Sequence, residues 1–158
     1  MVLYRNSRVD HLDRRLLAEL QNDARASSAE LARRIGLSGP GLQKRLRKLE
    51  EHRVIERYAT IVNREAVGLD LLCFVQVMLA HHRPESVKAF PDRINHMAEV
   101  LECHFLTGEV DYLLKVVVGN HEALQQFLFE KLMKVEGVDR IRTSIVVKEV
   151  KSTTSLPL

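Results

Sequence analysis

The densest group of residues that could do chemistry is a run of cationic and amide side chains between Ser38 and Lys48. Leu42, Leu46 and Leu49 recur within this run at helical spacing, which predicts one buried stripe along a helix. The polar side chains must then project from the opposite side of that helix. Arg and Gln can form paired hydrogen bonds to base edges in the major groove of B-DNA, which is wide enough for a helix.

We therefore predict a duplex-DNA contact surface on this helix. Its base-facing side would carry Pro40 with the polar residues one turn on, whereas the Ser38 hydroxyl and the helix N-terminus can hold a backbone phosphate. Arg45 and Lys48, nearer the flanks, suit phosphates better than bases. The alternative is an ordinary solvated basic helix. The predicted contact residues are Ser38, Gly39, Pro40, Gln43, Lys44, Arg45, Arg47 and Lys48.

The charge of the chain is uneven, although its net value is only +3. Residues 1–64 carry 14 Lys and Arg against 8 Asp and Glu, whereas residues 65–158 carry 10 against 13. A basic first part and a mildly acidic second part indicate that only the first part meets a polyanion. From charge alone, chance asymmetry is an equal alternative, and the helix pattern favours DNA binding.

The elements around this helix predict a winged helix-turn-helix domain over residues 1–62. A first helix spans about Asp10 to Gln21. Ser27 and Glu30 form a capping box for a short second helix, which Gly36 ends in the left-handed conformation. A tight turn then leads to Ser38, the cap of the third helix, and Val54–Val62 reads as an extended wing.

The pattern of predicted elements changes after a linker over residues 63–70. Residues 71–158 alternate strands and helices in the order βαββαβ, which predicts a ferredoxin-like sandwich and an α+β fold class overall. Pro91 lies inside the first of these helices, which must either kink or restart there. The predicted elements are Leu71–Ala80, Pro84–Met97, a hairpin of Val100–Thr107 and Val110–Val118 around Gly108, His121–Val135 and Val138–Val150.

Other chemistry is weakly supported by the residue pattern. Cys103-His104 beside His81-His82 could suggest a metal site or an enzyme centre, but the spacing matches no zinc pattern and no acid–base pair can be named. We expect no enzymatic activity, no metal and no cofactor. The N-terminus lacks the apolar core of a secretory signal, and no apolar run is long enough to span a bilayer, so we expect a cytoplasmic protein without a membrane partner.

The chain resembles the Lrp/AsnC family, the feast/famine amino-acid-responsive regulators, from about Leu12 to Leu158. The order and spacing of several short motifs carry this resemblance. They are Leu12-Asp13, Leu20-Gln21-Asn22-Asp23-Ala24-Arg25, Glu30-Leu31-Ala32, Gly36-Leu37-Ser38, Arg45, Leu49-Glu50, Val54-Ile55, Tyr58, Glu99-Val100-Leu101, Thr107-Gly108-Glu109, Asp111-Tyr112-Leu113-Leu114, Gly137-Val138, Lys151 and Thr153-Thr154.

The resemblance implies a homodimer formed through both domains, with four dimers closing into an octamer around which DNA can wrap. It implies that free amino acids bind in clefts between dimers, close to the hairpin. Carried over position by position, the effector contacts would be Gly108, Glu109, Asp111 and Tyr112, with Thr143 on the last strand as a weaker candidate. The alternative is a hairpin that only supports assembly.

A glycine turn suits an amino-acid zwitterion, since exposed backbone N–H groups can take its carboxylate and Asp111 or Glu109 its ammonium. The chain departs from the family where a glycine usually follows the third helix. Arg53 stands there, which predicts either a strained left-handed residue or a different cap. Gly39 and Gly41 also flank Pro40 at the start of that helix, and they remove side-chain contacts.

The resulting hypothesis is a sequence-specific, DNA-binding transcription regulator whose assembly or operator binding responds to a small molecule, an amino acid in the first place. The alternative is an architectural, nucleoid-type DNA-binding protein with no effector.

Overall fold

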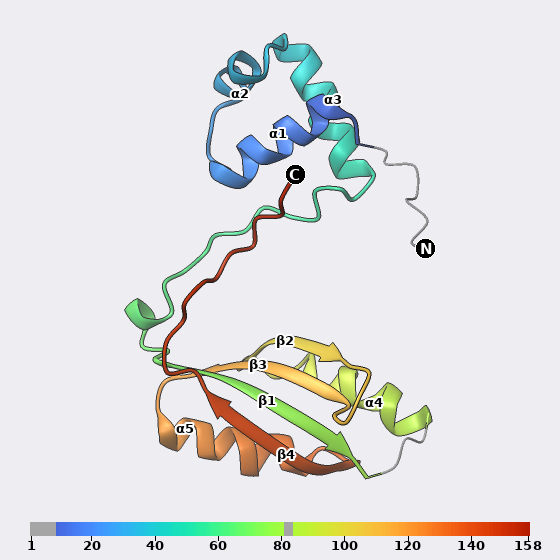
Figure 1. The fold of residues 1–158 in the computed structure, drawn as a ribbon, viewed down its shortest axis with the longest axis vertical. Coiled ribbons are helices and arrows are strands. Elements are labelled where there is room, and N and C mark those ends of the chain that lie inside the picture. The colour runs from blue at the N-terminus through green and yellow to red at the C-terminus, as the bar shows by residue number, and fades with distance from the viewer. Residues whose placement is uncertain (1–8, 81–83) are drawn as a thin grey trace. The chain divides into compact units, whose positions relative to one another are not determined.

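The computed structural model describes residues 9–80 and 84–158 of the chain (Figure 1). These residues form two compact units. Unit 1 comprises Met1–Ile61 together with Lys151–Leu158, and unit 2 comprises Val62–Val150. The predicted second domain ran to residue 158, but the end of the chain lies with unit 1, so the chain passes from one unit to the other twice.

Unit 1 contains the three predicted helices, α1 (His11–Asn22), α2 (Ser28–Ile35) and α3 (Gly39–Glu51). Each begins at a side chain that accepts a hydrogen bond from a free backbone N–H of its first turn: Asp10, Ser27 and Ser38. Gly36 ends α2 with φ +80°, in the left-handed conformation predicted for it.

Two local predictions for unit 1 need correction. Ser27 Oγ accepts from the Glu30 backbone N at 3.2 Å, but the Glu30 carboxylate accepts from Arg34 at 2.5 Å instead of completing a capping box. Val54–Val62 was predicted as a strand, but no strand is found there in the described part of the chain. A strand needs a hydrogen-bonded neighbour, which local residue preferences cannot supply.

The core of unit 1 is the meeting point of the three helices. Leu16, Leu31, Ile35, Leu42 and Leu49 are 0–4% exposed. Burying one such side chain stabilises the fold by about 1.5–3 kcal/mol. Two of the three leucines predicted to anchor α3 are therefore fully inside, and the third, at position 46, packs against them while partly buried.

Unit 2 has the predicted βαββαβ order and forms a four-stranded antiparallel sheet in the order β2-β3-β1-β4. This is the ferredoxin-like arrangement. Its strands are β1 (Leu71–Leu79), β2 (Val100–Phe105), β3 (Tyr112–Val118) and β4 (Val138–Ile145), and its helices are α4 (Pro84–Ile94) and α5 (His121–Gln126).

Several element bounds in unit 2 differ from the prediction. α4 neither stops nor restarts at Pro91, which lies inside it. α5 continues as a π turn over Phe127–Lys131 and a short 3-10 turn over Leu132–Lys134. β4 ends at Ile145 rather than at Val150 because pairing with β1 stops there, apart from one hydrogen bond from Val146 N to Leu72 O at 2.9 Å.

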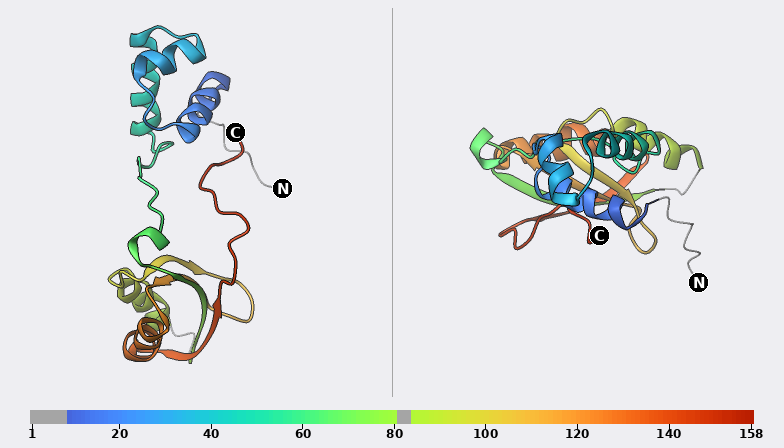
Figure 2. Two further views of the ribbon diagram at one scale, coloured as in Figure 1. Left: turned by 90° about the vertical axis from the view of Figure 1, so that its left-hand side faces the viewer. Right: turned by 90° about the horizontal axis from the view of Figure 1, so that it is seen from above.

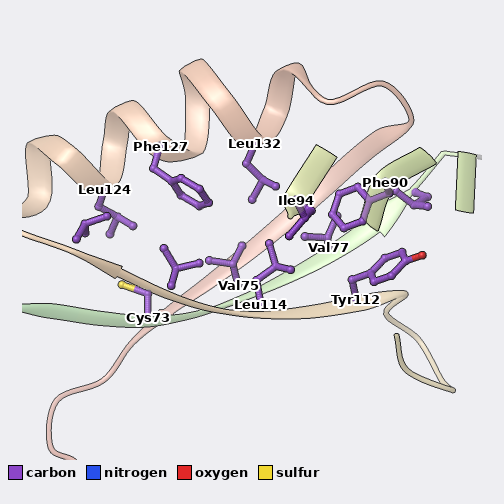
Figure 3. Packing of buried hydrophobic residues seen from close by; sticks show 13 residues of the cluster. Cys73, Val75, Val77, Phe90, Ile94, Tyr112, Leu114, Leu124, Phe127 and Leu132 are labelled. Carbon is purple, nitrogen blue, oxygen red and sulfur yellow. The ribbon is translucent and has the colours of Figure 1, made fainter. Parts of the chain in front are cut away.

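Both helices of unit 2 lie on one side of the sheet (Figure 2). Alternate residues of the central strands β1 and β3 point toward them, as Figure 3 shows for Val75, Val77 and Leu114, and each of these three is completely buried. Phe127 and Leu132 close the core from the helix side. Among the described residues, no helix is long and apolar enough to cross a membrane.

Candidate DNA-binding and effector sites

Helix α3 is held at its start by Ser38 and along one side by leucines. Ser38 Oγ accepts from Gly41 N at 3.2 Å, and Pro40 occupies the first turn, where its missing N–H is not needed. Leu42 and Leu49 are 0% and 1% exposed, so the other side of the helix faces outward. The predicted orientation of α3 is therefore confirmed.

The outward side of α3 is polar and cationic. Gln43, Lys44, Arg47 and Lys48 are all exposed, as are Ser38, Gly39 and Pro40 at the N-terminus. Gln43 Nε2 donates to Ser28 Oγ at 2.8 Å, so this side chain is held against the start of α2. The structure brings the predicted DNA-contact residues onto one surface, apart from Arg45. Lys48 is exposed, but its Nζ also lies 3.7 Å from Asp13 Oδ2.

The exception is Arg45, which turns toward α1 and is only 26% exposed in its side chain. One guanidinium nitrogen, Nη1, donates to Asp10 Oδ2 and to Asp13 Oδ1, each at 2.6 Å. The hydrogen bond from Arg45 lowers the pKa of the Asp10 carboxyl, and the same pairs raise the pKa of Arg45. This geometry engages Arg45 in holding α3 against α1.

Asp13 is the functional residue of this surface that our sequence reasoning missed. Its side chain is completely buried; its Oδ1 lies 2.6 Å from Arg45 Nη1 and its Oδ2 lies 3.7 Å from Lys48 Nζ. Asp13 and Asp10 also form a capping box for α1, since each side chain accepts from the other's backbone N. The acidic pair spaced three residues apart at a helix start was the available signal.

Of the two alternatives predicted for the end of α3, the structure shows the left-handed residue. Arg53 has φ +53° and is the one non-glycine residue with positive φ in the described chain. Its N–H donates to Glu50 O at 2.9 Å, and the next residue, Val54, donates to Leu49 O at 2.8 Å. These bonds satisfy the last carbonyls of the helix in the way a glycine cap usually does.

The predicted effector residues of the hairpin lie together between β2 and β3. Gly108 has φ +127°, a conformation that glycine adopts readily, and Glu109 beside it is exposed. Asp111 is more constrained: its Oδ2 accepts from Leu79 N at 2.8 Å, and its N–H donates to Val77 O at 3.1 Å. The carboxylate of Asp111 therefore secures the end of β1 at a bulge in its pairing with β4.

The other two predicted effector residues, Tyr112 and Thr143, do not lie in the exposed hairpin turn. Tyr112 is 2% exposed and its ring lies 4.5 Å from that of Phe90 and 5.1 Å from that of Phe105. Burial raises the pKa of its hydroxyl. Thr143 lies on β4, the edge strand opposite β2, and pairs with Val75 of β1. Within one chain, the structure does not bring Thr143 to the hairpin.

Two of the cavities formed by the described residues lie away from the hairpin. One of about 650 Å³ in unit 2 lies between α4 and the end of the α5 segment, with Arg93, His96 and Lys134 in its lining. The other, of about 670 Å³, is a groove in unit 1 along α1. Neither is lined by the predicted effector residues.

The metal and enzyme alternatives gain no support from the described residues. His81 and His82 lie outside them, and no group of three potential ligands that could hold a metal occurs within them. Burial raises the pKa of both cysteine thiols, Cys73 and Cys103.

Comparisons with known proteins agree with both units. Residues 9–50 match the profile of the AsnC-type helix-turn-helix domain, which together with the exposed face of α3 places unit 1 among the helix-turn-helix DNA-binding proteins. Residues 72–156 match the profile of the Lrp/AsnC ligand-binding domain.

Individual relatives extend the match over nearly the whole chain. The leucine-responsive regulatory protein of Rhizobium meliloti (strain 1021) is 38% identical over 150 residues, covering 95% of this chain and 96% of the relative. A transcriptional regulator of Neisseria meningitidis, solved in complex with L-methionine, has a TM-score of 0.90 at 34% identity, covering 94% and 96%. The feast or famine regulatory protein of M. tuberculosis, also solved with L-methionine, has a TM-score of 0.84 at 35% identity, covering 93% and 97%. The chain belongs to the Lrp/AsnC family of transcriptional regulators.

Proposed function

We propose that this regulator binds specific duplex operators through α3 and that a free amino acid modulates its assembly or its operator binding. The observation that carries the DNA-binding part is the outward side of α3, where Lys44, Arg47 and Lys48 stand over leucines buried in the core of unit 1. Two copies of unit 1 in a dimer would read a roughly palindromic operator, with half-sites about 34 Å or a multiple of it apart.

The test separates base reading from phosphate attraction on α3. Arg47→Ala should relax base preference and cost about 1–3 kcal/mol on the preferred duplex, because a paired Arg–guanine contact is lost. Lys48→Ala should weaken binding to all sequences alike and lower the salt slope by about one phosphate contact. Competition binding with preferred and scrambled duplexes at several salt concentrations measures both. If both variants bind as the wild type does, the assignment of this face to DNA fails.

The architectural alternative rests on Gly39 and Gly41, which remove side-chain contacts from the first turn of α3 on both sides of Pro40. A side chain could be added at Gly39, where a Cβ would meet nothing within 4 Å, but at Gly41 it would lie 3.1 Å from Ser38 Oγ. A wild-type specificity ratio near one in the competition assay would favour this second function over the first.

The effector part of the proposal rests on the hairpin and on the two neighbours solved with L-methionine. The turn at Gly108 offers backbone N–H groups for a carboxylate, with Glu109 and Asp111 beside it for an ammonium group. The resemblance to the family implies clefts between dimers, so we propose that another copy of the chain completes the amino-acid site beside this hairpin.

Thermal-shift screening of the twenty free amino acids identifies the effector, since a ligand of the folded state raises the unfolding midpoint. Asp111→Ala should abolish the shift and leave operator binding in place. Asp111 also accepts from Leu79 N, so Asp111→Asn, which keeps an acceptor oxygen there, is the matched control for fold. An Asp111→Ala variant with an unchanged ligand-induced shift would remove this residue from the site.

We also propose a homodimer that assembles further, to an octamer. The face of the unit 2 sheet that points away from α4 and α5 supports this. Phe74 is 37% exposed on β1, and it pairs with Lys115 and Ser144 on the neighbouring strands. A second copy laid against this face would cover it.

A further inference from the structure

The last residues of the chain, Lys151–Leu158, which we call the tail, belong to unit 1 although β4 of unit 2 leads into them. The tail is seated along the groove on unit 1 that is lined by α1 and by the extended segment 54–59. Leu156 and Leu158 line this groove together with Leu17, Leu20 and Ile55.

A pair of complementary hydrogen bonds fixes the tail in the groove. Gln21 Nε2 donates to Leu156 O at 3.1 Å, and Leu156 N donates to Gln21 Oε1 at 2.6 Å. The side-chain amide of Gln21 thus pairs with the backbone of Leu156 as a neighbouring strand would. Pro157 favours an extended conformation of Leu156, which presents both of its backbone groups.

These bonds are exposed, and Leu156 itself remains 67% exposed. Exposed hydrogen bonds exchange with water at little net free energy, so the seated tail is held weakly and can leave the groove. A weakly held segment is suited to regulation, since small differential contacts move its equilibrium between docked and undocked states.

The groove is connected to the DNA-reading helix on one side and to the effector unit on the other. Its wall includes Tyr58, whose hydroxyl donates to Glu50 Oε1 on α3 at 3.0 Å. At the other end, Val146 is still bonded to β1, after which Val147 and Val150 are 99% and 89% exposed on the way to the tail. A short exposed segment thus joins the end of β4 to the tail.

We propose that docking of the tail on Gln21 is the route by which effector occupancy in unit 2 changes DNA binding by unit 1. This inference rests on the proposed function, because it assigns a path to the modulation proposed there. The tail is the second covalent passage between the units, and Gln21 is a positioning residue for it, with no role in touching DNA or effector.

The experiment uses the full-length chain and a duplex that the protein selects from a random pool. The amino acid used is the one of the twenty that most changes the affinity of the protein for this duplex. Gln21→Glu replaces the donor NH₂ with an oxygen facing Leu156 O, and Leu156→Pro removes the N–H. Gln125→Glu, at an exposed position of α5, and Leu156→Ala, which keeps the backbone amide, are the matched controls.

Coupled sites change each other's affinity by roughly 5–150-fold. The measured quantity is the ratio of operator affinity with the amino acid to operator affinity without it. We expect this ratio to fall toward one in Gln21→Glu and Leu156→Pro and to stay at the wild-type value in both controls. Operator affinity without amino acid and the ligand-induced thermal shift should be unchanged in all four variants.

Wild-type ratios in both test variants would overturn the inference and leave the proposed function standing. Loss of operator binding without any amino acid in both would also overturn it, since the tail would then merely hold unit 1 together. A wild type that responds to none of the twenty amino acids would refute the effector part of the proposed function, and the inference with it.

Discussion

At the residue scale, the buried carboxylate of Asp13 is the group on which the contact between α1 and α3 most depends. A buried charge is tolerated only when it is paired and hydrogen-bonded. Asp13 receives hydrogen bonds from the Asp10 backbone N and from Arg45 Nη1, with the ammonium group of Lys48 nearby. The pairs join the first turn of α1 to the middle of α3, and so they set where α3 lies.

We predict that Asp13→Asn lowers the free energy of unfolding by about 2 kcal/mol, because it removes the buried carboxylate that accepts from Arg45 and leaves the exposed Asp10 as the one acidic partner of that guanidinium. Urea denaturation of the full chain measures this. Asp92→Asn, an exposed position in unit 2, serves as the control and should stay within about 0.5 kcal/mol of the wild type. An Asp13→Asn variant as stable as the wild type would show that its charge does not hold α3.

The hairpin residues illustrate how one side chain can serve both fold and site. Asp111 was predicted from the family resemblance as an effector contact, and in the structure its carboxylate accepts from the backbone of β1. Tyr112, predicted in the same way, is packed between two phenylalanine rings. Substitutions here must therefore be read beside a measurement of stability, as in the Asp111→Asn control.

At the scale of an element, the end of α3 carries an avoidable strain. A left-handed conformation costs a non-glycine residue roughly 1–2 kcal/mol, and glycine adopts it freely. Arg53 holds φ +53° with an exposed side chain.

We predict that Arg53→Gly raises the free energy of unfolding by about 0.5–1 kcal/mol, after allowance for the greater freedom of glycine in the unfolded chain. Arg53→Ala retains a Cβ and should bring no such gain. Thermal unfolding of the three proteins side by side distinguishes relief of strain from loss of the arginine side chain. Equal midpoints for the Gly and Ala variants would count against strain at this position.

The α5 segment is another element whose form was not foreseen in detail. Its amphipathic spacing predicted one continuous helix over His121–Val135, and the structure places a π turn in the middle. Phe127, Leu124 and Leu132 are nevertheless buried against the sheet. The apolar side chains thus reach the core although the helical period changes beneath them.

At the scale of the whole molecule, the open face of the unit 2 sheet is where we expect assembly to begin. Phe74 projects from β1 on that face and is partly exposed. A carboxylate placed there would be desolvated in any interface that covers the face, at a cost of several kcal/mol unless it found a partner.

We predict that Phe74→Asp dissociates the assembly to smaller species, measured by light scattering across a range of concentrations. Phe129→Asp makes the same chemical change at a residue that is 57% exposed in the α5 segment and should leave the mass unchanged. A Phe74→Asp protein with the mass of the wild type would direct the search for the interface to another surface.

The sequence alone determined the features that depend on neighbours a few residues apart. Helical spacing placed Leu42 and Leu49 inside, the caps at Ser27 and Ser38 began their helices, and Arg53 was recognised as a residue in a left-handed position. The alternation of strands and helices was enough to predict the order βαββαβ. Such features follow from local sterics and periodic burial, which a single chain segment already contains.

The tertiary structure decided everything that depends on which distant segments meet. It paired Arg45 with Asp13, separated Thr143 from the hairpin, ended β4 where pairing with β1 stops, and seated the tail on Gln21. The extended segment after α3 has no strand partner in the described chain, so its residue preferences alone did not make it a wing. Long-range pairing is set by the packing of the whole unit, and no local pattern in the sequence encodes its geometry.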